Sequence, residues 1–192
     1  MKLPELLIEY LIIGCFSLVW LIPLLIILNY FPNINNFFPV FAALLLPCTY
    51  VLGMVIDFLA STILKNKQKE NYEKIKVKFK MTKQEIQMCF SHRYISFFII
   101  KAPQILKESQ SRGSRHRIAR STILNFFSIL VTLIIYDIKH FTCTYPTDLK
   151  IICHLLVGVF FIFFSYKMWL KYHELFYSYV ITAYRLLADE SI

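Results

Sequence analysis

The sequence lacks the patterns that mark most soluble enzymes. It has four glycines in 192 residues, and no charged side chain lies between Leu11 and Ile56. It contains no HExxH, GxSxG, P-loop or HxxxxD pattern, and Arg112 and His116 stand too close together for an RxxxxH nuclease motif. These absences predict a chain that is not an enzyme and needs no cofactor.

Metal-binding and disulfide patterns are also missing. The five cysteines form no CxxC pair. The histidines are widely separated and share no ligand spacing: they are His92, His116, His140, His154 and His173. We therefore predict no metal site. Cys143 and Cys153 are ten residues apart, a spacing that leaves open whether they form a disulfide.

What the chain does have is apolar sequence in long runs. Apolar residues make up 57% of it, and the mean hydropathy is +0.56. The turn-forming cluster 31–39 divides the first uncharged run into helices expected at about 6–30 and 40–64, each long enough to cross a bilayer. Two more spans are expected at about 121–138 and from 149 onward. We predict an all-α membrane protein, a bundle of four transmembrane helices.

Lysine and arginine placement sets the expected orientation. Residues 65–120 hold fifteen of the twenty-one Lys and Arg against four Glu, so this segment alone carries +11. The positive-inside rule puts it and both termini in the cytoplasm. The membrane we expect is the cytoplasmic (inner) membrane. The expected organisation is a first transmembrane hairpin at 1–64, a basic cytoplasmic segment at 65–120, and a second hairpin at 121–192 with a helical cytoplasmic extension.

Two structures are expected inside the basic segment. Lysines alternate strictly with apolar residues over 74–81, which predicts a short β strand. Thr82 and Glu85 then form a capping-box pattern. This pattern predicts the start of an amphipathic helix that lies on lipid or packs beneath the spans, and that Pro103 ends.

A polar stripe and an arginine cluster are the candidate functional residues. Hydroxyl and amide side chains recur at helical spacing along the third span, and Asp57 in the second span is an intramembrane carboxylate that needs a partner, either Arg117 or Arg120. The expected intramembrane polar network is Asp57, Ser61, Ser121, Asn125, Ser128 and Thr132. The expected binding residues for a partner or phosphate are Arg112, Arg115, Arg117 and Arg120.

Three pieces of the chain carry a resemblance to a known group of proteins. They are LPELLIEY at 3–10, the YxxGxxxD pattern of Tyr50, Gly53 and Asp57, and SRHRIARS at 114–121 with Asn125. The pattern resembles small four-span membrane proteins of prokaryotic antiviral defence loci, such as the membrane accessory proteins of type VI CRISPR systems and the membrane subunit of Kiwa. The resemblance implies an accessory that works with a cytosolic, nucleic-acid-handling partner.

The function expected is that of a membrane accessory or effector protein, homo-oligomeric, whose basic segment docks a cytosolic protein and signals or acts at the membrane. Its partners would be membrane lipid and that protein. Direct binding of nucleic acid is the less favoured alternative, because the lysine-rich segment lacks a surface of aromatics for stacking bases. Two further alternatives remain: an oligomeric pore lined by Asn125, Ser128 and Thr132, and a passive anchor for a partner complex.

Overall fold

The computed structural model describes residues 3–28, 38–90, 93–139 and 147–189, and these are helical apart from short turns. Cys143, and with it the question of a disulfide to Cys153, lies outside the described residues. Within these described ranges seven helices follow one another: α1 (Leu3–Ile27), α2 (Phe38–Ile63), α3 (Lys65–Lys78), α4 (Lys83–Phe90), α5 (Arg93–Lys101), α6 (Pro103–Lys139) and α7 (Thr147–Asp189).

Four of these helices, α1, α2, α6 and α7, are long and apolar enough to cross a membrane. This agrees with the expected multi-pass membrane protein. Helices α6 and α7 have 37 and 43 residues. They are therefore about 55 Å and 65 Å long, roughly twice the thickness of a ~30 Å hydrocarbon layer. Each can cross the layer and extend well beyond it.

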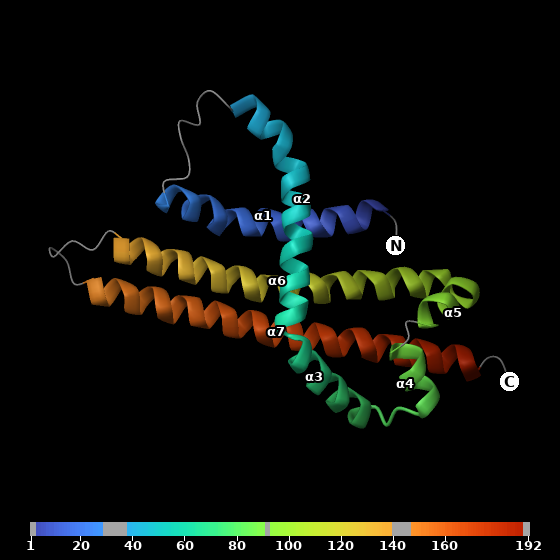
Figure 1. The fold of residues 1–192 in the computed structure, drawn as a ribbon. Helices are drawn as coiled ribbons and strands as arrows, with labels where there is room; N and C mark the ends of the chain where they lie inside the picture. Colours follow the sequence, from blue (N-terminus) through green and yellow to red (C-terminus); the bar gives the residue numbers. More distant parts are fainter. Residues whose placement is uncertain (1–2, 29–37, 91–92, 140–146, 190–192) are drawn as a thin grey trace.

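Helix α2 does not lie alongside its neighbours. In Figure 1, α1, α6 and α7 lie roughly side by side, whereas α2 crosses them at a steep angle. Two glycines make this crossing close. A Cβ atom on Gly14 would lie 1.8 Å from the carbonyl oxygen of Thr49, and one on Gly53 would lie 1.9 Å from that of Tyr10. The missing side chains are what allow the two backbones to touch.

The predicted β strand at 74–81 is wrong. Residues 65–78 form α3, and a turn follows at Phe79 and Lys80. The alternating residues do not form one buried apolar face and one exposed lysine face, because Ile75 is buried whereas Val77 is 77% exposed. Lysines and glutamates three and four residues apart form ion pairs along α3. Such pairs stabilise a helix, and they include lysines of the segment in which lysines and apolar residues alternate. A strand here would also have no partner strand in the described part of the chain.

The capping box at Thr82 and Glu85 is present. The backbone N–H of Thr82 donates to Oε2 of Glu85 at 2.6 Å, and the N–H of Glu85 donates to the Thr82 hydroxyl at 3.3 Å. The segment that follows is divided into α4 and α5 instead of one helix. Pro103 stands just after the end of α5, and it is also the first residue of α6, a position that needs no N–H donor.

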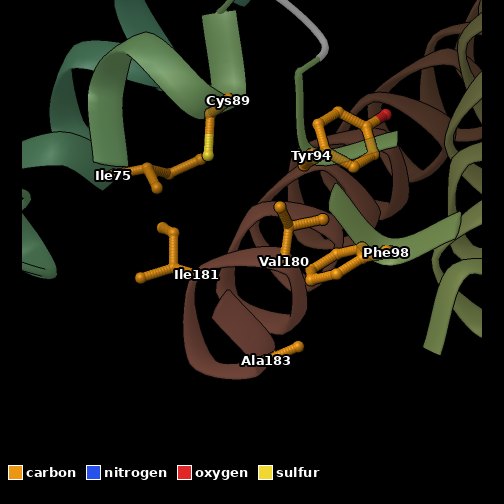
Figure 2. Packing of buried hydrophobic residues seen from close by; sticks show 7 residues of the cluster. All are labelled: Ile75, Cys89, Tyr94, Phe98, Val180, Ile181 and Ala183. Carbon is orange, nitrogen blue, oxygen red and sulfur yellow. The ribbon is translucent and has the colours of Figure 1, made fainter. Parts of the chain in front are cut away.

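Helices α3, α4 and α5 pack around the C-terminal part of α7, and we call this assembly the head (residues 65–90 and 93–101 with 172–188). Figure 1 shows it gathered near the C-terminus. Its core comes from α3, α4, α5 and α7, and Figure 2 shows the side chains that form it. The buried residues of this core are Ile75, Cys89, Tyr94, Phe98, Val180, Ile181 and Ala183. The head is thus a packed unit rather than a loop between spans.

Candidate functional site

A seam of buried polar side chains runs along α6 and joins it to α1 and α2. Its first contact is with Glu9 of α1, whose side chain is 2% exposed. Arg117 donates from Nε to Oε1 of Glu9 at 2.5 Å and from Nη2 to Oε2 at 2.7 Å. The Ser114 hydroxyl lies 2.8 Å from the same Oε2. This fork-on-carboxylate geometry is the strongest form of Arg–Glu pair.

The second contact joins α6 to α2, close to the point where the two helices cross. Arg120 donates from Nη2 to Oδ1 of Asp57 at 2.5 Å, and the Ser121 hydroxyl donates to the same oxygen at 3.1 Å. The carboxylate of Asp57 therefore has both a counter-charge and a hydroxyl donor. The alternative partner for Asp57, Arg117, belongs to Glu9.

The third contact is a neutral one, around Asn125. Its Oδ1 accepts from the Trp20 indole at 3.0 Å and lies 2.9 Å from the Ser17 hydroxyl, while its Nδ2 donates to the carbonyl of Ile13 at 3.4 Å. Asn125 is 1% exposed. An amide held by three groups of α1 fixes the register of the two helices, because a buried polar group is costly to leave without partners.

The remaining predicted network residues do not join the seam. The Ser61 hydroxyl donates to the carbonyl of Phe58 on its own helix. Thr132 likewise donates to the carbonyl of Ser128 at 2.9 Å. The structure therefore brings Ser121 together with Asp57 of α2 and places Asn125 against α1. It leaves Ser61, Ser128 and Thr132 in contacts within their own helices.

Three of the four predicted binding arginines are held by other residues of the chain. Arg117 and Arg120 belong to the ion pairs of the seam. Arg112 pairs with Glu108 at 2.9 Å and lies over the Tyr179 ring, 4.5 Å from its centroid. Only Arg115 is exposed without an ion-pair partner among the described residues. The arginine cluster therefore offers one free cation to a ligand rather than four.

A second buried cluster escaped the sequence reasoning. The Trp169 indole donates to Nε2 of His116 at 2.8 Å, and the His173 ring lies 4.8 Å from the His116 ring. Nδ1 of His173 is 2.8 Å from Nδ2 of Asn71. The cluster thus connects α6, α7 and α3. Its one sequence signal is the spacing of four between Trp169 and His173, which places both on one face of a helix.

Lysines on the head form the largest set of exposed cations. Residues 65–83 contain eight lysines and two glutamates. Glu70 binds Lys67 and Lys74, Glu73 binds Lys76, and Glu174 binds Lys78. Of the eight lysines in this stretch, those with no ion-pair partner in the described ranges are Lys65, Lys69, Lys80 and Lys83. This surface keeps a net positive charge after the internal pairs are counted.

Packing in the head changes the proton affinities of several of its groups. Burial raises the pKa of the Cys89 thiol to about 11 and that of the Tyr72 hydroxyl to about 12. The hydrogen bond from Arg185 holds the pKa of Glu85 below its ordinary value. Arg185 Nε lies 2.5 Å from the Glu85 carboxylate, so α4 is tied to α7 by charge as well as by packing.

No group of three His, Cys, Asp or Glu side chains in the described part of the chain could hold a metal ion.

Compared with known proteins, the chain matches no family model, no curated protein and no solved structure.

Proposed function

We propose that this chain is a non-enzymatic, multi-pass membrane protein that holds a docking unit on the cytoplasmic side of the inner membrane. The docking unit is the head, and its ligand is a cytosolic protein with an acidic surface. The observation that supports this most is the lysine-rich surface of a packed head, which internal ion pairs leave partly unneutralised.

The packed core favours docking over simple positive-inside flanking. A loop that only sets topology needs cations but needs no buried core, and here four helices enclose one. Rigid presentation of charges lowers the entropy lost on binding, because the side chains start from an ordered frame. A head of this kind suits recognition of a partner with fixed geometry.

The docking surface we propose is the C-terminal end of α3, the turn after it and the start of α4, rather than the arginine cluster. Arg112, Arg117 and Arg120 already have partners within the chain, so a ligand would have to break ion pairs to reach them. Lys80 and Lys83 are exposed and have no such partner among the described residues. Charge complementarity at these lysines would steer an acidic protein to the head.

The biological system in which this docking takes place is also part of the proposal. The resemblance to membrane accessories of antiviral defence loci favours a partner that handles nucleic acid, with the membrane protein as effector or signalling subunit. Helix α7 exposes Phe160, Phe163 and Phe164 by 62%, 59% and 54%. Lipid and a second copy of the chain are the coverings we propose for this apolar face.

A pore receives less support from the side chains that were its candidate lining. Asn125 and Thr132 are buried in hydrogen bonds within the chain. Such groups act as contacts between or within helices rather than as a wetted surface.

Charge reversal at the lysines tests the proposal. We would compare the doubly substituted chain Lys80→Glu with Lys83→Glu against a matched control, Lys101→Glu with Lys107→Glu, which changes two other exposed lysines. The full chain would be purified from its native membrane after cross-linking, and the protein that accompanies it would be identified and measured by mass spectrometry. We expect the first pair to lose that protein and the control pair to keep it.

Three results would contradict the proposal. Equal loss in both pairs would show only that binding depends on overall charge, and unchanged recovery in the first pair would remove the end of α3 and the start of α4 as the docking surface. A partner whose release requires nuclease treatment would show that nucleic acid, and not an acidic protein, binds the lysines.

A further inference from the structure

An apolar groove opens where α2 meets α6 and α7. It has a volume of about 230 Å³, and its lining includes Ala60, Ile63 and Leu64 from α2 and its end, Leu124 and Phe127 from α6, and Ile162 from α7. Every lining residue is apolar. Water is not stabilised in this groove, because the apolar side chains that line it offer no hydrogen bonds. An apolar chain is the occupant that matches this lining.

Lysines follow one of the lining residues directly in the chain. Leu64 lines the groove, and Lys65 is the next residue, the first of α3. Lys65 and Lys69 line a second hollow of about 460 Å³, together with Asn66, Gln68, Tyr72, Cys89 and Tyr177. Both lysines lack an ion-pair partner in the described part of the chain. Two lysines of α3, which we call the rim, therefore follow Leu64 of the apolar slot within five residues of the chain.

We propose that this groove and its rim bind one anionic phospholipid. One acyl chain fills the slot between α2, α6 and α7, and the phosphate group lies against Lys65 and Lys69. The charge of the rim selects the headgroup, and the apolar lining selects the chain. This lipid site is separate from the docking surface for a protein partner, which lies further along the head at Lys80 and Lys83.

Selectivity for an anionic headgroup is the measurable consequence. The full chain would be placed in nanodiscs of phosphatidylcholine that contain a minor fraction of phosphatidylglycerol, then released gently, and retained lipid would be counted by native mass spectrometry. We expect one retained phosphatidylglycerol per chain. Each lysine near the phosphate should contribute on the order of a fivefold preference over phosphatidylcholine.

Two sets of substitutions test the contributions of the two lysines and of the apolar groove separately. Lys65→Gln with Lys69→Gln should reduce the preference toward that of a neutral rim, while the control Lys101→Gln with Lys107→Gln should keep it. Leu124→Trp should block the slot and remove the retained lipid. Its control is Leu156→Trp, which adds the same ring at a residue that is 68% exposed on α7.

A competition on the unmodified chain keeps the test valid if Leu124→Trp does not fold. Glycerol 3-phosphate carries the phosphate without an acyl chain, so it should not displace the lipid at millimolar concentration. If glycerol 3-phosphate did displace the lipid, the apolar groove would not be part of the binding site. Equal retention of the two phospholipids, or a preference that survives the loss of Lys65 and Lys69, would overturn the proposal.

Discussion

Arg120 on α6 and Asp57 on α2 meet at 2.5 Å, with side chains only 9% and 10% exposed. This contact fixes where two helices cross, because neither charge has another ionic partner among the described residues. One turn earlier on α6, Arg117 makes the corresponding contact with Glu9 of α1. Adjacent turns of one helix thus bind two different helices, and α6 is the element around which the membrane-spanning part is assembled.

Removing one partner of the crossing pair should destabilise the protein strongly. Arg120→Met leaves the Asp57 carboxylate buried without its counter-charge, a change that costs about 3–5 kcal/mol in comparable buried pairs. Unfolding of the purified chain in detergent, followed by circular dichroism against temperature, measures the loss. The double variant Arg120→Met with Asp57→Asn should recover much of it.

Arg115→Met is the control for that experiment. Arg115 lies on the same helix but is exposed and has no ion-pair partner in the described ranges. Its loss should change the free energy of unfolding by no more than about 0.5 kcal/mol. Equal destabilisation by the Arg115 and Arg120 substitutions would show that the buried pair is not what holds the crossing.

Two glycines should respond to alanine in opposite directions. At Gly53 the new Cβ would meet the backbone of α1 at 1.9 Å, so Gly53→Ala must push the two helices apart and lower stability. At Gly113 the nearest atom is 3.6 Å away, an ordinary contact. Gly113→Ala should therefore raise stability by up to about 1 kcal/mol, because alanine favours helix more than glycine does.

The measurement is the thermal midpoint of the two variants in the same detergent. Stabilisation by Gly53→Ala would show that α1 and α2 do not touch as the structure has them. The two glycines differ in what lies against them, which is the backbone of α1 at Gly53 and a ring atom of Phe176 at Gly113.

Stability of the head should depend on the charge of Glu85. Its pKa is lower in the folded chain than the ordinary glutamate value because Arg185 donates to it. The contribution of the pair is therefore complete above the ordinary pKa and is lost as the pH falls through the folded pKa. Melting of the unmodified chain between pH 7 and pH 3 should show this loss, and Glu85→Gln should show a smaller dependence on pH.

The four long apolar helices could be predicted from the sequence, because runs of uncharged residues report directly on span length. The pairing of Asp57 with one arginine of the third span could also be predicted, since both lie near the same end of their spans. The choice between Arg117 and Arg120 could not. The two lie one turn apart on one face, and which helix each meets depends on the steep crossing of α2, set by contacts at Gly14 and Gly53.

The predicted strand failed for a related reason. The alternation over 74–81 is only part of a longer pattern, because lysine–glutamate pairs begin earlier, at Lys67 and Glu70, and favour a helix over the whole segment. The head core was also hidden from the sequence. Val180 and Ile181 come from the far end of α7, about a hundred residues after Ile75, and only the fold brings them together.

Cys89 offers a chemical test of the head core. Burial raises the pKa of its thiol from 9.0 to about 11, so at pH 8 the reactive thiolate should be roughly a hundredfold scarcer than for an ordinary cysteine. Its side chain is also 4% exposed, which limits access of the reagent. Iodoacetamide treatment of the native chain in detergent, read peptide by peptide, should leave Cys89 largely unlabelled.

We expect the slow labelling of Cys89 to result from packing of the head core and not from the low reactivity of iodoacetamide. The same treatment in denaturant should label Cys89 at the rate of a free thiol. Phe98→Ala, which removes a fully buried ring of the same core, should increase labelling of Cys89 in the native chain. The matched change Ile100→Ala, at a residue that is 79% exposed on the same helix, should leave labelling slow. Rapid labelling of the unmodified chain would mean that α4 does not pack against α7, and the head would then be a loop rather than a folded docking unit.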